Sequence, residues 1–137
     1  MMKFDETDSL NYHGKEVKFY TPTRKTAGRV KKIFRKEPIT ITWMDNMKQG
    51  DIVIDIGANV GMYSLMSAVG RSAKVYAFEP EASNYNLLCQ NIRLNDMQHK
   101  VTAYCAGNLD YDGFSVLNIA QDRDVGPGGS CHTVDEE

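Results

Sequence analysis

The chain has 137 residues, a length that fits one domain. Hydrophobic residues make up 42% and charged residues 25% of it, which favours a packed core and excludes wholesale disorder. The formal net charge of −2 gives no overall attraction to nucleic acid, so we expect no nucleic-acid partner. No apolar run is long enough to cross a bilayer, and we expect no membrane span.

Cysteine usage and the first residues indicate the compartment. Cys89, Cys105 and Cys131 are odd in number, lie far apart and form no C-x-x-C pair. A disulfide framework and a structural zinc site are therefore disfavoured, and we expect no metal. The acidic start of the chain is unlike a secretory signal. These features predict a cytoplasmic protein.

The opening third, residues 1–49, is predicted to be a lead-in of short elements without visible chemistry. Alternation predicts a strand over 16–20, and helical spacing predicts helices over 25–35 and 41–47. Seven basic residues and no acidic one lie between Arg24 and Lys36. This stretch is either a phosphate-binding patch or the solvated face of an amphipathic helix, and we favour the helix face because no aromatic platform is interleaved with the charges.

The middle of the chain alternates strands and helices. Apolar runs predict strands over 52–56, 75–79 and 101–105, the first of them buried on both faces of a parallel sheet. Helical spacing predicts a helix through 62–69 and another that ends near Asn95. We therefore expect an α/β fold, a Rossmann-like doubly wound parallel sheet of which residues 50–119 form the first βαβαβ half.

This half sheet is incomplete, because its first strand belongs at the centre of the full fold and is here left as an apolar edge. A fragment, a partner chain or second copy that completes the sheet, and a divergent minimal protein are competing explanations, and we favour the fragment. Residues 114–119 could add a short antiparallel strand. Residues 120–137, rich in glycine and acids, read as a loop or tail.

The chemistry-bearing motif is Asp55-Ile56-Gly57-Ala58-Asn59-Val60-Gly61, where the first strand of the parallel sheet turns into a helix. Ligands of open α/β sheets bind at such turns. Gly57 and Gly61 allow a tight bend and the close approach of a ligand. Asp55 places a carboxylate beside the pocket, and Glu79 ends the next strand as an acceptor for a ribose diol.

The residue types in this turn favour one cofactor. A dinucleotide site has the pattern G-x-G-x-x-G, whereas this chain has only Gly57-x-x-x-Gly61. Asp55 would repel a pyrophosphate but suits S-adenosylmethionine, which carries an ammonium and a sulfonium. We therefore expect S-adenosylmethionine, and a NAD-dependent oxidoreductase is the less favoured enzyme.

The segments VIDIGANVGMYSL, VYAFEPEASNYNLLCQNIRLN and VTAYCAGN resemble the FkbM family of methyltransferases, with KEPITITWMDNMKQGD and GPGGS as weaker similarities. The resemblance implies cofactor binding by the loop that includes Asp55, Gly57, Ala58, Asn59 and Gly61. It implies further that Glu79 contacts the ribose hydroxyls, Asn59 the methionine portion and Asn108 the adenine. It also implies O-methylation of a sugar, glycan or other small metabolite.

A general base is not evident from the sequence. His132, Asp110 and Asp112 are candidates, but each fits a loop or turn role equally well. We therefore assign no catalytic residue. A non-catalytic S-adenosylmethionine-binding fragment or subunit remains the alternative to an active methyltransferase.

Overall fold

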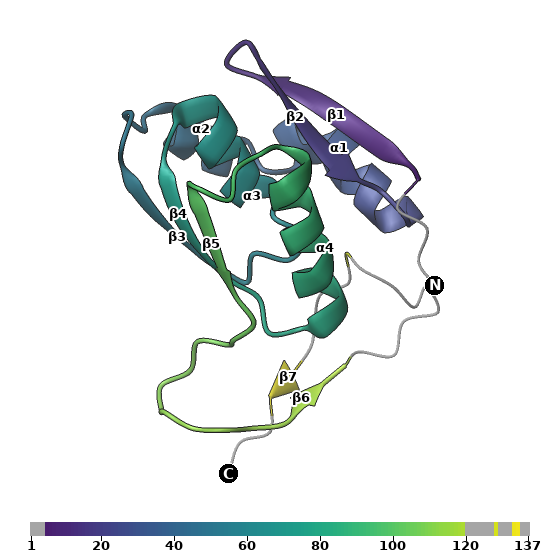
Figure 1. Cartoon of the computed structure of the whole chain (residues 1–137), viewed down its shortest axis with the longest axis vertical. Helices are drawn as coiled ribbons and strands as arrows, with labels where there is room; N and C mark the ends of the chain where they lie inside the picture. Colours follow the sequence, from purple (N-terminus) through teal and green to yellow (C-terminus); the bar gives the residue numbers. More distant parts are fainter. Residues whose placement is uncertain (1–4, 120–127, 129–132, 135–137) are drawn as a thin grey trace.

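The structure is a computed structural model that describes residues 5–119, 128 and 133–134. At its centre is a parallel sheet of three strands in the order β3-β4-β5 (Figure 1). These strands are β3 (Ile52–Ile56), β4 (Lys74–Phe78) and β5 (Val101–Tyr104). The predicted α/β fold, with one βαβαβ half of a Rossmann-like sheet, is confirmed.

Two helical crossovers connect the strands. The first, between β3 and β4, is α3 (Met62–Leu65) followed directly by a π-helical turn, η1 (Met66–Gly70). The second, between β4 and β5, is α4 (Ala82–Leu94), whose first turn is capped by Glu81. Apolar spacing predicted the first crossover as one helix through 62–69, and the structure divides it into α3 and the π-helical turn.

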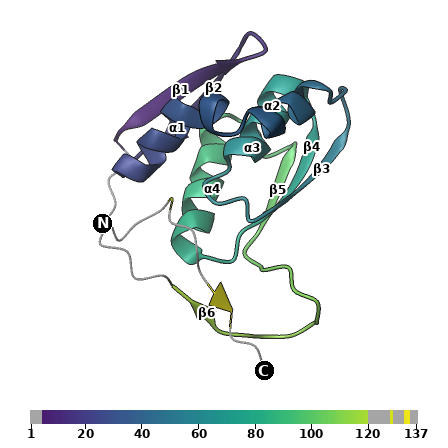
Figure 2. The same ribbon diagram turned by 180° about the vertical axis from the view of Figure 1, so that it is seen from behind.

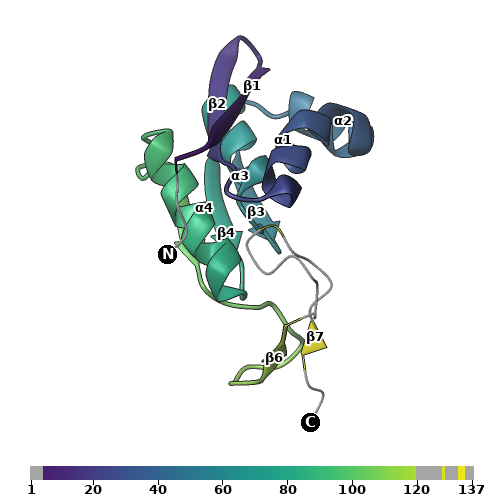
Figure 3. The same ribbon diagram turned by 90° about the vertical axis from the view of Figure 1, so that its right-hand side faces the viewer.

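An antiparallel hairpin precedes the sheet. It pairs β1 (Thr7–Tyr12) with β2 (Lys15–Tyr20), and its two turn residues, His13 and Gly14, both have positive φ, at 51° and 74°. That backbone fits a two-residue hairpin turn whose twist matches the strands. The second strand was predicted, but its partner was not. The hairpin packs over η1 and α4 (Figure 3).

Two helices link the hairpin to the sheet. The first, α1 (Arg24–Lys36), begins with a capping box between Thr23 and Thr26 and buries Val30 and Ile33. The second, α2 (Pro38–Asp45), has proline in its first turn and therefore starts three residues before the predicted helix. α1 lies alongside the hairpin, and α2 follows it (Figure 2).

The prediction that β3 is buried on both faces is wrong for the part of the chain that the structure describes. Ile52, Ile54 and Ile56 are 66%, 64% and 63% exposed, whereas Val53, on the opposite face, is buried under the helices. No second strand pairs with β3 among the described residues. A continuous apolar run fits a strand whose sheet is covered by helices on both faces, and among the described residues helices cover only the face that carries Val53.

Past β5 the chain runs through a long loop to β6 (Leu117–Asn118), which pairs antiparallel with β7 (Thr133–Val134). The expected strand over 114–119 is thus shorter than predicted, although its antiparallel pairing is correct. Most of the predicted tail, 120–137, lies outside the described residues. Among the residues that are described, no helix is both long and apolar enough to cross a bilayer.

Candidate functional site

The glycine turn after β3 is fixed to the tip of β4 by backbone hydrogen bonds. The N–H groups of Gly57 and Ala58 both donate to the carbonyl of Phe78, each at 2.9 Å. Gly57, Asn59 and Gly61 all have left-handed φ values, of 74°, 52° and 88°. Such a backbone favours glycine at 57 and 61 and tolerates asparagine at 59.

The two glycines of this turn serve different purposes. A Cβ built on Gly57 would meet nothing within 4 Å, so this position borders open space. A Cβ on Gly61 would lie 2.5 Å from Cδ1 of Leu88, a buried residue of α4. Gly61 therefore permits close packing of the turn against α4. The sequence predicted the close approach of a ligand at this glycine, but its close neighbour is the side chain of Leu88.

Glu79 holds the turn from the end of β4. Its side chain is only 4% exposed, and Oε2 accepts a hydrogen bond from the Asn59 N–H at 2.7 Å. Oε1 accepts from the Glu81 N–H at 2.9 Å. A carboxylate has about four acceptor positions, so two backbone bonds leave capacity for further donors.

A pocket of about 290 Å³ lies between the glycine turn and the loop after β5. Four of the predicted cofactor-binding residues line it, namely Gly57, Asn59, Glu79 and Asn108. The volume is close to the lower end of the range of small-molecule sites, about 300–1,000 Å³. The other lining residues, absent from the prediction, are Ile56, Pro80, Asn84, Ala106, Gly107, Leu109, Leu117 and Val134.

Three predicted residues do not line this pocket. Ala58 and Gly61 are buried in the turn beneath it. Asp55 points toward the helical layer, where its Oδ2 accepts a hydrogen bond of 2.6 Å from the hydroxyl of Ser64. Burial raises the pKa of Asp55; the bond from Ser64 lowers it, and the negative charge of Glu79 raises it.

Asn84, in the first turn of α4, is a pocket residue that sequence reasoning missed. It is buried, and its Oδ1 accepts a hydrogen bond of 2.7 Å from the Gly128 N–H. The carbonyl of Gly128 accepts in turn from the guanidinium of Arg29 in α1, at 2.7 Å from Nη2. Asn84 could have been predicted from its place in the first turn of a helix, three positions after Glu81. Helix starts of this kind lie at the end of a parallel sheet where ligands bind.

The suggested general bases gain no support from the geometry. Asp110 and Asp112 lie in the exposed loop after β5, and neither lines the pocket. His132 lies outside the described residues. The site therefore consists of a glycine turn, a buried carboxylate and amide side chains around a pocket, and we assign no catalytic residue.

Solved structures with the same fold define the class of protein. The crystal structure of Pyrococcus horikoshii TYW2 in complex with MeSAdo has a TM-score of 0.53 and 26% sequence identity, and the match covers 80% of this chain and 39% of that one. The structure of M. jannaschii TYW2 in complex with AdoMet has the same TM-score, at 20% identity, with 77% and 45% covered, and shows the fold alone. The class is the Rossmann-like fold of S-adenosylmethionine-dependent methyltransferases.

The sequence profile of the TRM5/TYW2 methyltransferase domain matches residues 32–123, which is more than half of the chain. The chain therefore belongs to this family. The expectation of S-adenosylmethionine as the cofactor is confirmed at the level of the family.

Curated relatives agree with this placement. A tRNA(Phe) (4-demethylwyosine(37)-C(7)) aminocarboxypropyltransferase of Pyrococcus horikoshii is 35% identical over 71 residues, 52% of this chain and 26% of that protein. Methyltransferase sdnD of Sordaria araneosa is 38% identical over 63 residues, 45% of this chain and 24% of that protein. The chain thus spans about a quarter of the length of these relatives.

Two predictions are overturned by these matches. The resemblance to the FkbM family is wrong, because the matching family is the TRM5/TYW2 methyltransferase domain. The segments that suggested FkbM form the glycine turn and include Glu79, directly after β4. These features are shared by the fold and do not distinguish one family from another.

The expectation of no nucleic-acid partner is also wrong, since the Pyrococcus relative acts on tRNA. Net charge averages over the whole surface, whereas a nucleic acid responds to the local distribution of charge.

Proposed function

We propose that this chain is the S-adenosylmethionine-binding part of a transferase that modifies tRNA. The observation that carries the proposal is the fixed glycine turn beside Glu79, within residues 32–123, which match a methyltransferase family. The named relative with 35% identity is a tRNA-modifying enzyme, and this supports tRNA as the acceptor. Methylation of sugars or glycans has no comparable support.

The pocket residues fit the cofactor chemically. Gly57 leaves open space where the turn borders the pocket, so a bound ligand can approach the backbone. Glu79 offers its remaining acceptor positions to ribose hydroxyls, and its charge favours a cationic ligand over a pyrophosphate. Asn59 lines the same pocket and has an amide that can bind the methionine portion.

When bound, S-adenosylmethionine supplies a carbon activated by its sulfonium. The residues of this chain then have to hold the donor and exclude water while the acceptor base is brought in line. Leu109, Leu117 and Val134 give the pocket an apolar side opposite the polar turn, which serves that exclusion.

Two groups of the cofactor could be transferred. The family as a whole favours methyl transfer, whereas the name of the Pyrococcus relative favours the aminocarboxypropyl group. The two reactions differ in the bond to sulfur that breaks. Loss of methyl leaves S-adenosylhomocysteine, and loss of the aminocarboxypropyl group leaves methylthioadenosine.

Position-specific labels test the proposal. The chain is incubated with a tRNA(Phe) transcript and cofactor labelled either in the methyl group or in the carboxyl group. Methyl label in the RNA indicates methyltransferase activity, and carboxyl label indicates aminocarboxypropyl transfer. Absence of cofactor binding, or absence of any binding to the tRNA(Phe) transcript in a parallel titration, would contradict the proposal.

A further inference from the structure

We infer that the outer face of α1 binds the sugar-phosphate backbone of the RNA substrate, an inference that rests on the proposed function. We define the basic face of α1 as Arg24, Lys31, Lys32 and Arg35. All four side chains are exposed, whereas Thr26, Val30 and Ile33 are buried on the opposite side of the helix. From Arg24 to Arg35 the face runs about 17 Å along the helix, at 1.5 Å per residue.

The basic face lacks acidic partners on its own helix. α1 contains seven basic residues and no acidic one, although the whole chain carries a net charge of −2. Lys31 and Arg35 are like charges four residues apart, an arrangement that destabilises a helix. Lys31 approaches Asp8 at 3.9 Å while its side chain stays 68% exposed, so this ion pair is weak. Bound phosphates would offset the repulsion between the basic side chains of α1.

Gly28 lies among these charges, one turn after Arg24. A Cβ built at this position would meet nothing within 4 Å, and the backbone is ordinary helix, so no packing in the described structure calls for glycine. Glycine in mid-helix costs about 0.5–1 kcal/mol relative to alanine. Because Gly28 has no side chain, a phosphate backbone could approach the helix closely at the middle of the basic face.

The helix that carries the basic face is linked to the cofactor pocket by hydrogen bonds from Arg29, a residue outside that face. Arg29 donates to the carbonyl of Gly128, and the Gly128 N–H donates to the side chain of Asn84, which lines the pocket. These bonds fix α1 relative to the pocket, so RNA bound on the outer face of α1 would be held in a fixed position relative to the donor site.

The four residues of the basic face include no aromatic one, and the neighbouring Phe34 lies against Tyr12 of the hairpin. This composition is compatible with the inference. Stacking platforms serve single strands, whereas helical RNA is bound mainly through phosphates and hydroxyls. A tRNA is mostly helical, so a basic helix face without aromatics fits its backbone.

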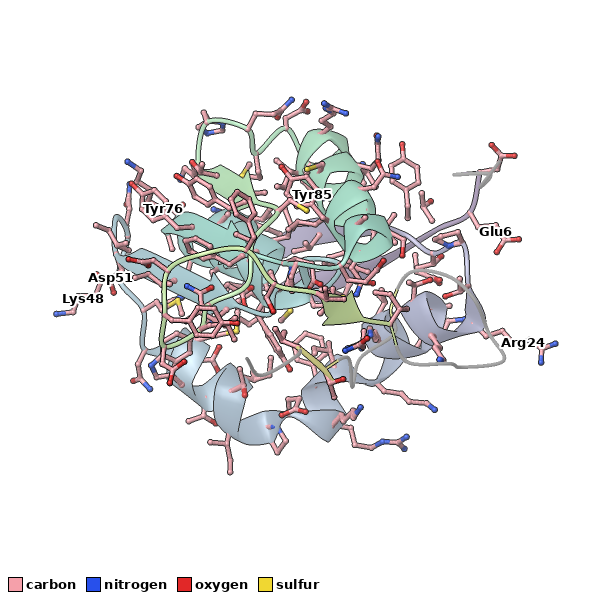
Figure 4. All side chains as sticks on the ribbon, turned by 90° about the horizontal axis from the view of Figure 1, so that it is seen from below. Glu6, Arg24, Lys48, Asp51, Tyr76 and Tyr85 are labelled. Atoms are coloured by element: carbon pink, nitrogen blue, oxygen red, sulfur yellow. The ribbon has the colours of Figure 1, made fainter. Side chains whose placement is uncertain are left out.

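The test compares two triple variants that remove the same charge. Arg24→Gln, Lys32→Gln and Arg35→Gln neutralise the basic face but keep Lys31 with Asp8. Lys48→Gln, Lys74→Gln and Arg93→Gln are the matched control on other exposed sites. Figure 4 places Arg24 and Lys48 on opposite sides of the molecule. Binding of a tRNA(Phe) transcript to the full chain is measured over a salt series, with circular dichroism and cofactor titration as folding checks.

We expect the basic-face variant to lose at least tenfold in RNA affinity and the control variant to change less than threefold. The slope of log affinity against log salt should fall by about two to three in the first variant, as for three lost phosphate contacts. Equal effects of the two variants, or none, would overturn the inference while leaving the proposed function standing. Failure of the unmodified chain to bind the transcript would overturn both. If the basic-face variant lost binding to phosphatidylserine vesicles but kept its RNA affinity, the inference would be overturned, and the face would bind a membrane surface.

Discussion

The backbone N–H of Asn59 donates to Oε2 of Glu79 at 2.7 Å, so the turn after β3 and the tip of β4 form one rigid unit. Oε1 of the same carboxylate accepts from the N–H of Glu81, which extends the unit to the start of α4. One buried side chain thus fixes the shape of the pocket wall and offers its remaining acceptor positions to a ligand.

Replacing Glu79 should weaken cofactor binding more than replacing the neighbouring acid Glu81 does. We expect Glu79→Ala to weaken S-adenosylmethionine binding by about 1–3 kcal/mol, the range for a lost charged acceptor. Titration calorimetry measures the change. Glu81→Ala is the control, because it removes the cap of α4, costs about 1 kcal/mol of stability and leaves the affinity largely unchanged. Equal losses of affinity in both variants would contradict a specific role for Glu79.

The two glycines of the turn should respond differently to alanine. Gly61→Ala adds a Cβ 2.5 Å from the buried Leu88, so it should lower the free energy of unfolding by more than Gly57→Ala. Gly57→Ala carries only the strain of a left-handed backbone, about 1–2 kcal/mol. Urea unfolding measures both. Combining Gly61→Ala with Leu88→Ala should lower the free energy of unfolding by less than the sum of the two single variants, and an additive loss would argue against the clash.

Asp55 should make stability depend on pH. Because burial raises its pKa, the folded state holds the proton more tightly than the unfolded state does. Its contribution is most favourable below the ordinary aspartate pKa of about 3.9, and it diminishes as the pH rises through the raised folded-state pKa. Asp55→Asn, whose amide oxygen still accepts from Ser64, should therefore gain stability relative to the unmodified chain between pH 3 and 7.

Unfolding free energies measured across that pH range check this prediction. Ser64→Ala removes a bond that lowers the Asp55 pKa, so it should move the loss of stability to higher pH. Parallel pH profiles for the unmodified chain and Asp55→Asn would show that this carboxyl does not titrate as the structure indicates.

Asn91 connects the hairpin to the glycine turn through its side-chain amide. The buried Oδ1 accepts from the N–H of Tyr20 in β2, and Nδ2 donates to the carbonyl of Val60. Asn91→Ala leaves both backbone groups without this partner, at about 1–3 kcal/mol for each buried group. We expect a loss of about 2–5 kcal/mol in chemical denaturation. Asn86→Ala, on the exposed side of α4, is the control and should change stability by less than about 0.5 kcal/mol.

The sequence predicted those parts of the fold in which local patterns agree with the tertiary structure. The strand β3 was found from the apolar run at 52–56, and α4 was found because Leu88 and Ile92 are buried at helical spacing. The strand β1 was missed because its pairing is decided by the turn at His13 and Gly14, a weaker signal than Asn-Gly. Exposure of Ile54 depends on chain neighbours that periodicity cannot reveal.

The candidate site was predicted where chemistry follows directly from residue type. Gly57, Asn59 and Glu79 lie at strand ends, and strand ends can be located from sequence. The direction of Asp55, toward Ser64 and away from the pocket, follows from strand alternation and helix placement together. Asn84 and Leu117 reach the pocket from elements whose positions are set only by the folded chain.

Titration calorimetry of the folded 137-residue chain with S-adenosylmethionine and, separately, with NADH tests the central claim most directly. The arrangement of Gly57, Asn59 and Glu79 predicts saturable binding of S-adenosylmethionine at one site, weakened by Glu79→Ala, and no binding of NADH. Absence of S-adenosylmethionine binding at millimolar concentration, with circular dichroism showing an intact fold, would contradict the account.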